Sequence, residues 1–312
     1  MSLLIPFRSD NKERQRAFAW VRRYWKRELP DAEIIIGKSR GRPFCKTEAL
    51  NDAASRARGR VLVVLDADTY MPGSILDRCA DRILEELANH LWYVPYRHLY
   101  RLNRGATQRV LASKPSDPLR FPSPPLPGDL DGDGMKSGYG HRYGAMVTIF
   151  PREALEVLGC FDERFKGWGG EDVAILRALD TLYGKHKTTQ NDVLHLWHPV
   201  IGKNYKTRAW SGQDAARNDE LSNAYNRATR NPSQMRRLVD EGCEFRKKKK
   251  PIKDIKWVLG RSWHAIASPA RVENRYKTMC GRVIYGDVVA KLPAGKSCEN
   301  CLRIVARRAD VV

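Results

Sequence analysis

RVLVVLDADT, residues 60–69, decides the fold of this chain. Its five consecutive apolar residues, VLVVL, are typical of a strand that is buried on both faces of a parallel sheet. The run ends on Asp66-Ala67-Asp68, and ligands of open α/β sheets bind at the carboxyl ends of the strands. The stretch therefore predicts an α/β protein with a ligand site at Asp66 and Asp68.

The segments around this strand alternate between strands and helices, as a doubly wound sheet requires. Short apolar runs predict strands at residues 2–6 and 33–36. Apolar residues at helical spacing predict helices at 11–28, 47–57 and 74–89. We expect these elements to form one layered domain around the strand that ends at the two aspartates.

The pattern changes after residue 103. Residues 104–138 are dense in Pro, Gly, Ser and Asp, and this composition predicts a long loop without regular elements. A strand is expected at 145–150, followed by helices at 152–158 and 172–183.

The length and charge of the chain suggest two domains. Its 312 residues and 42% hydrophobic content suffice for one large α/β domain, which we place at residues 1–243, and a small appendage at 257–312. The basic linker at 244–256 contains the run RKKKK. With a formal net charge of +20, polyanions such as nucleic acid are plausible partners, although a merely well-solvated surface explains the charge equally well.

The sequence predicts a soluble, cytoplasmic protein. No stretch reaches the roughly 20 continuous apolar residues of a membrane span, so we expect no membrane insertion, and the first residues lack the order of a secretory signal. Four of the cysteines, Cys45, Cys79, Cys160 and Cys243, are scattered singly, which does not favour a disulfide scaffold.

A second motif, GWGGED, occupies residues 167–172. Glycines on both sides of Trp168 let the backbone approach a ligand, and the indole offers a flat apolar face on which a sugar ring can stack. Glu171 and Asp172 then begin a helix, where they could act on a hydroxyl or merely complement the helix dipole. The dipole explanation accounts for the acids but not for the tryptophan.

Together, LVVLDAD, the segment AMVTIFPREALEVLGCFDERFKGWGGEDVAILRAL and VLHLWHP resemble the nucleotide-sugar glycosyltransferases of family 2. The GWGGED segment resembles in particular the β-1,4-galactosyltransferase and chondroitin-polymerase types. The resemblance covers about residues 2–200. It implies a GT-A (nucleotide-diphospho-sugar transferase) fold with a doubly wound sheet.

The resemblance also implies roles for the motif residues. Asp66 and Asp68 would contact the donor and its metal, Glu171 would orient the acceptor, and Asp172 would be the catalytic base. The turn residues Trp168, Gly169 and Gly170 would line the donor. An aspartate at the position of the base implies inversion at the anomeric carbon.

A metal-binding histidine is implied on the strand after the GGED helix, where VLHLWHP offers His195 and His198. Residues three apart on a strand point to opposite faces, so the spacing favours one ligand, and His195 matches the family position. A histidine beside apolar residues can equally be a core residue. Imidazole together with carboxylates favours Mn²⁺ over Mg²⁺, although Mg²⁺ stays open.

Three further residues are candidates for contacts with the nucleotide base and the diphosphate. Arg8 and Asp10 follow the first predicted strand, and Lys46 directly precedes the second predicted helix. The segment IPFRSDN has no glycine-rich phosphate loop, which disfavours a nucleotidyltransferase on a similar sheet.

The C-terminal piece carries a possible zinc site. His264, Cys280, Cys298 and Cys301 supply four ligands for structural Zn²⁺, in a pattern that resembles small His-Cys-Cys-Cys modules. A piece of this size also needs such a metal to hold its fold. Reduced cysteines in a packed core are the alternative.

The sequence thus predicts a metal-dependent glycosyltransferase that uses a nucleotide-sugar donor, most readily a UDP-sugar. Its acceptor hydroxyl could belong to nucleic acid, protein or glycan. The alternative is a nucleic-acid-binding zinc protein whose GT-A-like domain is inactive; such a protein would bind DNA with a steep salt dependence and hydrolyse no sugar nucleotide.

Overall fold

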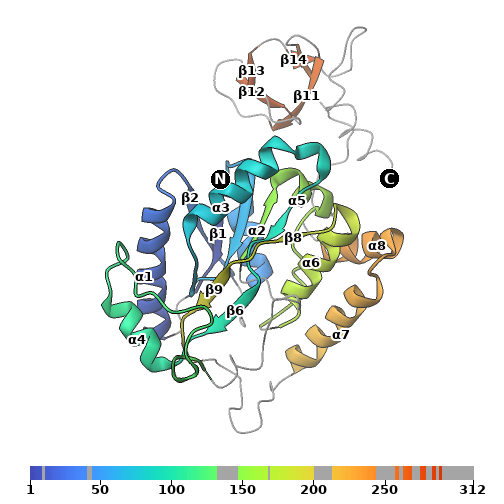
Figure 1. Cartoon of the computed structure of the whole chain (residues 1–312). Coiled ribbons are helices and arrows are strands. Elements are labelled where there is room, and N and C mark those ends of the chain that lie inside the picture. Colours follow the sequence, from blue (N-terminus) through green and yellow to red (C-terminus); the bar gives the residue numbers. More distant parts are fainter. Residues whose placement is uncertain are drawn as a thin grey trace. The chain divides into compact units, whose positions relative to one another are not determined.

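The computed structural model (Figure 1) describes most of the first 243 residues and five strands beyond them. In that first part the described residues are 1–8, 11–40, 44–131, 147–167, 169–199 and 213–243. The chain divides into two compact units, residues 1–247 and 248–312, and each is described by itself.

A six-stranded sheet lies at the centre of the first unit, in the order β2-β1-β3-β7-β5-β8. Its strands are β1 (Ser2–Pro6), β2 (Glu33–Gly37), β3 (Val61–Leu65), β5 (Tyr93–Val94), β7 (Val147–Pro151) and β8 (Lys187–Thr188). Every residue of β1, β3 and β7 is buried, because continuous apolar strands need cover on both faces. The strands predicted from apolar runs are confirmed.

The sheet is mixed, which corrects the prediction of a doubly wound parallel sheet. β1 pairs in parallel with both β2 and β3, but β7 runs antiparallel to β3 and β5. The composition of β7 could not reveal this, since VTIFP is as continuously apolar as VLVVL. Strand direction is set by the path of the chain between the two strands and not by burial.

Eight α-helices accompany the sheet in the described residues. They are α1 (Lys12–Glu28), α2 (Lys46–Arg56), α3 (Gly73–Glu85), α4 (Arg104–Ala112), α5 (Arg152–Leu158), α6 (Glu171–Leu182), α7 (Gln213–Arg227) and α8 (Pro232–Gly242). Short 3₁₀ turns lie at Leu87–Asn89 and Pro127–Asp129. Among the described helices, none combines the length and the apolar character that a membrane span requires.

Helix α4 corrects the prediction of an uninterrupted loop at 104–138. The Asn103 side chain caps the helix by accepting a hydrogen bond from the Ala106 amide at 2.9 Å. Ala106 and Val110 bury one face of the helix. The helix escaped detection because the density of proline and glycine rises only after Ala112, so the average over the whole stretch hid a helical start.

A second sheet places the end of β9 beside the turn that follows β3. It has the order β4-β9-β6, with β4 at Thr69–Tyr70, β6 at His98–Arg101 and β9 at Asp192–His195. Thr69 pairs with His195, and the next amide, of Leu196, donates to the Asp68 carbonyl at 2.8 Å. Residues more than 120 positions apart therefore meet at the carboxyl end of β3.

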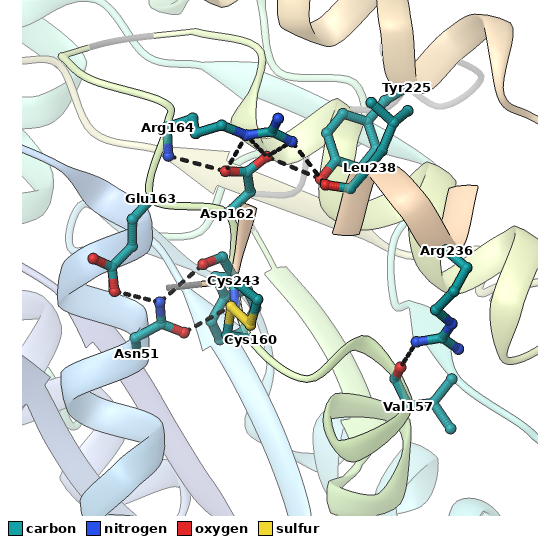
Figure 2. The surroundings of a disulfide bond; sticks show 11 residues. Asn51, Val157, Cys160, Asp162, Glu163, Arg164, Tyr225, Arg236, Leu238 and Cys243 are labelled. Atoms are coloured by element: carbon teal, nitrogen blue, oxygen red, sulfur yellow. Dashed lines mark hydrogen bonds and ion pairs between the residues drawn. A yellow bond between two sulfur atoms is a disulfide. The ribbon is translucent and has the colours of Figure 1, made fainter. Parts of the chain in front are cut away.

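The end of α8 is tied to the segment after α5. A disulfide joins Cys160 and Cys243, which are 83 residues apart, as Figure 2 shows. The sequence does not predict the bond, because each of these cysteines stands alone in the sequence. They meet only because the end of α8 packs against the segment after α5. Protein disulfides are rare in reducing compartments, so the bond removes cysteine spacing as an argument for a cytoplasmic location. Cys45 and Cys79 are free and buried.

Next to the disulfide lies a buried ion pair between Asp162 and Arg164 (Figure 2). Asp162 accepts two further kinds of contact, from the Arg164 amide at 2.9 Å and from the Tyr225 hydroxyl at 3.0 Å. Arg164 also donates to the Leu238 carbonyl at 2.7 Å. The network therefore fixes α7 and α8 to the segment that leads into GWGGED.

A substitution at Gly242 would test how rigidly the side chains of this network are packed. A Cβ at this position would lie 2.4–2.6 Å from the carboxylate atoms of Asp162, and that carboxylate cannot move without losing Arg164 and Tyr225. We expect Gly242→Ala to lower the free energy of unfolding by about 1–3 kcal/mol in urea titrations. Gly128→Ala is the control, because a Cβ there meets nothing within 4 Å. Equal effects of the two changes would contradict the crowding at Asp162.

The second unit contains a five-stranded sheet in the order β13-β12-β11-β10-β14. Its strands are β10 (Trp257–Leu259), β11 (Trp263–Ser268), β12 (Arg275–Thr278), β13 (Val283–Tyr285) and β14 (Val288–Val289), all paired antiparallel. His264 belongs to β11, but its side chain lies outside the described part. Cys280, Cys298 and Cys301 also lie outside it, and the zinc site stays a prediction.

Candidate functional site

In the turn that follows β3, the side chains of Asp66 and Asp68 contact different groups. Asp66 and Asp68 both lie at the carboxyl end of the strand, and the turn is closed by the Thr69 hydroxyl, which donates to the Asp66 carbonyl at 3.0 Å. The Asp66 carboxylate contacts Lys46, whereas the Asp68 carboxylate contacts two histidines. One motif thus serves two adjacent clusters of charged side chains.

The first cluster consists of Asp68, His195 and His198. Nε2 of His195 lies 3.3 Å from Oδ1 of Asp68, and Nε2 of His198 lies 3.0 Å from Oδ2. Nδ1 of His198 lies 3.0 Å from the Pro199 carbonyl, which orients the ring so that Nε2 faces the carboxylate. Asp68 is 3% exposed, and the two histidine side chains are mostly buried around it.

Both histidines take part, contrary to the alternation argument that favoured His195 alone. Strand β9 ends at His195, so residues beyond it no longer alternate between the two faces of a sheet. The chain turns, and His198 comes back to the same carboxylate with the two ring centroids 5.4 Å apart. The inference from strand geometry was wrong because it extended the strand by three residues.

The pKa values of Asp68 and His195 suit a divalent cation, whereas His198 would have to release a proton to bind one. Burial raises the pKa of Asp68, but His195, His198 and Arg14 outweigh it and hold the pKa well below its usual range, so the carboxylate is ionised. Burial lowers the pKa of His195 to about 3, which leaves its ring neutral with a free lone pair. Burial also lowers the pKa of His198, but Asp68 reverses the direction and raises it.

The geometry also fits a metal. The three ligand atoms all lie within 4.8 Å of one another, so one ion can reach them together. One carboxylate and two imidazoles are a donor set typical of Mn²⁺ and other first-row metals, and less typical of Mg²⁺, which prefers oxygen. Asp68, His195 and His198 are therefore a candidate metal site.

The second cluster places three carboxylates around the ammonium of Lys46. Nζ of Lys46 lies 2.8 Å from Oδ1 of Asp66 and 2.8 Å from Oδ1 of Asp172. Oε1 of Glu171 is 3.7 Å away. Burial lowers the pKa of Lys46, but Asp172, Asp66 and Glu171 raise it far more, so Lys46 is charged.

Burial, together with the excess of three carboxylates over one ammonium, changes the acidity of Asp172 and Asp66. Burial raises the pKa of Asp172 to about 8, with Glu171 and Asp66 adding to the rise and Lys46 opposing it. Burial likewise raises the pKa of Asp66. A carboxylate with a pKa near neutrality can take up and release a proton at physiological pH, which is the property of a general base.

The start of α2 brings Lys46 to this cluster. The Phe44 carbonyl accepts a hydrogen bond from the Gly167 amide at 3.1 Å, and Sγ of Cys45 contacts the Phe165 carbonyl at 3.1 Å. These contacts fix the residues before Lys46 against the segment before α6. Lys46 and Asp172 therefore meet although 126 residues separate them.

Glycines shape the turn before α6. Gly169 and Gly170 have φ values of +103° and +85°, which residues with a Cβ rarely adopt. A Cβ on Gly170 would also come within 3.0 Å of the Asn218 carbonyl and of Ser222 on α7. The turn is therefore tightly packed against α7.

Asn218 holds the same segment through its side chain. Its amide donates to the Lys166 carbonyl at 2.7 Å, and its side-chain oxygen accepts from the Lys166 amide at 3.2 Å. Asn218 is buried, and this double hydrogen bond fixes the chain just before the glycine turn. Nothing in the local sequence of α7 indicates this role.

Of the other residues predicted to contact the donor, the structure describes Arg8 but not Asp10 or Trp168. The Arg8 guanidinium lies 5.2 Å above the Phe44 ring, which places it near the start of α2. Asp10 and Trp168 lie outside the described residues, so their donor contacts stay predictions. Sequence reasoning missed Arg14, whose Nε is 3.8 Å from Oδ2 of Asp68; its only signal is its place on the first turn of α1.

Comparison with known proteins gives similar structures but no family. No protein-family model matches the chain, and no curated protein is significantly similar to it. Ninety-eight chains of solved structures match significantly.

Three of these structures are glycosyltransferases. The catalytic domain of Drosophila β1,4-galactosyltransferase 7 with xylobiose is 19% identical, with a TM-score of 0.36, over 72% of this chain and 79% of that one. A variant of that enzyme with manganese, UDP-Gal and xylobiose is 18% identical, with a TM-score of 0.35, over 70% and 78%. A mannosyltransferase from Pyrobaculum calidifontis with GDP-Man and Mn²⁺ is 14% identical, with a TM-score of 0.38, over 79% and 70%. Similarities this low carry no functional argument, which rests instead on the side chains described above.

Proposed function

We propose that this chain is a metal-dependent glycosyltransferase of the GT-A type, which transfers a sugar from a nucleotide-sugar donor to an acceptor hydroxyl with inversion. A UDP-sugar is the first donor to test. The proposal is supported by two adjacent clusters that share the Asp66-Ala67-Asp68 motif. One is a candidate three-ligand metal site at Asp68, and the other contains the part-buried Asp172, whose pKa is raised to about 8.

The metal cluster defines the donor side of the site. Asp68, His195 and His198 would hold Mn²⁺, or Mg²⁺ as the second choice. When bound, the metal neutralises the diphosphate that leaves the sugar. Arg14 beside Asp68 adds a fixed positive charge at this end of the site.

Asp172 is the base in this proposal. It takes the proton of the acceptor hydroxyl as the hydroxyl oxygen attacks the anomeric carbon and the bond from that carbon to the diphosphate breaks. A single displacement of this kind inverts the anomeric configuration. Glu171, which is buried one residue earlier, orients the acceptor.

Lys46 connects the two sides. Its ammonium contacts Oδ1 of Asp172 at 2.8 Å and so occupies an oxygen that the base needs. A diphosphate brings more negative charge to this region and would draw the ammonium away from Asp172. Donor binding would then release the base, which favours an ordered reaction in which the donor binds first.

Sugar-nucleotide turnover tests the proposal directly. The full chain is incubated with Mn²⁺ and a panel of UDP- and GDP-sugars, and release of the free nucleotide is measured with and without chelator. Metal-dependent release from at least one donor is expected, and NMR of the product should show the inverted anomer. If no sugar nucleotide is consumed with Mn²⁺ or Mg²⁺, the proposal is wrong, and the alternative of an inactive domain on a nucleic-acid-binding protein gains support.

Asn218 offers a second test, of how the base is positioned. Asn218→Ala removes both side-chain hydrogen bonds to Lys166, so we expect kcat to fall roughly 10- to 100-fold while donor binding changes little. Asn226→Ala on the same helix is the control, because that side chain bonds only to Arg177 in the described residues. A loss of stability without a change in kcat would make Asn218 a packing residue.

A further inference from the structure

Helix α1 carries an unusually basic exposed face. Its apolar side is buried against the sheet, whereas six cationic side chains are exposed to solvent: Lys12, Arg16, Arg22, Arg23, Lys26 and Arg27. Only one acidic residue of the helix, Glu13, is comparably exposed. Within the described residues, none of the six is paired with an acidic side chain.

Four of the cations form one stripe. Successive residues of a helix are rotated by about 100°, so Lys12, Arg16, Arg23 and Arg27 lie within roughly 60° of one another. At about 1.5 Å per residue the stripe is about 22 Å long. Duplex DNA carries one charge per about 1.7 Å with both strands counted, so a stripe of that length spans a stretch of duplex with roughly a dozen phosphates, of which those on the near side can be contacted.

Helix α4 extends the same face. It packs beside α1, as Figure 1 shows, and Nε1 of Trp20 donates to the Ser113 carbonyl just after α4 at 2.9 Å. Arg104, the first residue of α4, and Lys114, two residues after its end, are both exposed. We call the six cations of α1 together with Arg104 and Lys114 the basic face.

The basic face comes near the candidate site at Arg104, on α4. Arg14 reaches Asp68 at 3.8 Å but is not part of this face, because it lies roughly 170° around α1 from the middle of the stripe, on the buried side of the helix. The Arg104 guanidinium lies 5.4 Å above the ring of Trp197, which stands between His195 and His198 in the sequence. A polymer bound along these helices would therefore pass Trp197, a residue that stands between His195 and His198.

The chemistry of the face favours a phosphodiester chain as its partner. Four of the six cations on α1 are arginines, whose guanidinium groups bind phosphate oxygens in pairs. A membrane surface would need apolar anchors as well, and Leu126 is the large hydrophobic residue that is exposed in the described part, away from α1 in the sequence.

We propose that the basic face binds the phosphate backbone of nucleic acid and that the bound strand carries the acceptor hydroxyl. The second half of this statement rests on the proposed glycosyltransferase function; the first half does not. The partner is recognised by its charge, so binding is expected to depend weakly on base sequence and strongly on salt.

Neutralising the stripe tests the binding. The variant Lys12→Gln, Arg16→Gln, Arg23→Gln, Arg27→Gln in the full chain is compared with a control that loses four exposed cations elsewhere: Lys185→Gln, Arg217→Gln, Arg227→Gln, Arg237→Gln. Binding of a fluorescent DNA duplex of about 30 base pairs is measured by anisotropy from about 50 to 200 mM salt.

We expect the stripe variant to bind roughly 10- to 100-fold more weakly and its slope of log K against log salt to fall by about 3, while the control stays within roughly twofold. Equal weakening of the two variants would mean that only net charge matters, and an unchanged stripe variant would mean that DNA binds elsewhere; either result overturns the proposal. A larger loss for heparin than for DNA would assign the face to anionic glycans instead.

A separate readout keeps the two proposals apart. Metal-dependent hydrolysis of the sugar nucleotide should be unchanged in the stripe variant, because none of its four residues contacts the clusters in the described structure. Lost DNA binding with intact hydrolysis supports the basic face. DNA binding without hydrolysis in the unchanged protein would contradict the glycosyltransferase function and leave the nucleic-acid surface standing.

Discussion

Asp68→Asn should abolish metal-dependent sugar transfer and lower Mn²⁺ affinity by roughly 10²-fold or more, because it removes the only anionic ligand of the cluster. The neutral amide would also present N–H groups or an uncharged oxygen to two imidazole nitrogens that now face a carboxylate. Calorimetric titration with Mn²⁺ and nucleotide-release assays measure the two effects.

Asp66→Asn is the matched control for this change. It alters the same type of residue two positions earlier, but the carboxylate contacts Lys46 and is not part of the metal cluster. Mn²⁺ affinity should therefore be nearly unchanged, whatever happens to turnover. If Asp66→Asn loses the metal and Asp68→Asn keeps it, the two clusters have been assigned the wrong way round.

Asp172→Asn should reduce kcat by roughly 10²- to 10⁴-fold while the Kd of the donor stays within a few-fold, as expected when a positioned base is lost. The fold should survive, because Lys46 keeps Asp66 as a partner at 2.8 Å. Presteady-state turnover and donor titration separate the two quantities. An equal loss in donor affinity would make Asp172 a binding residue.

The pH profile provides an independent test of the same residue. A base must be ionised, so with the pKa of Asp172 raised to about 8, kcat/KM should rise with pH and level off above that value. The positive charge of Lys46 lowers the pKa of Asp172, so Lys46→Gln should move the rising limb to higher pH. A limb that stays in place would show that it belongs to another group.

The local pattern of apolar residues was sufficient to predict the main strands and helices of the first unit. Continuous apolar runs marked β1 and β3, and helical spacing marked α1 and α2, because burial on two faces or on one stripe is a property of near neighbours. The same reasoning placed Asp66 and Asp68 at a strand end and Asp172 at a helix start. The short helix α4 was lost because a composition averaged over a long window outweighed its own few residues.

Only the tertiary structure decided which of these groups meet. The direction of β7, the disulfide from Cys160 to Cys243 and the contact of Lys46 with Asp172 all join residues between about 80 and 130 positions apart. Such contacts depend on how loops close and helices pack, which leaves no periodic trace in the sequence. His198 shows the limit most clearly: the sequence supplied the residue, but the end of β9 three positions earlier decided that it turns back to Asp68.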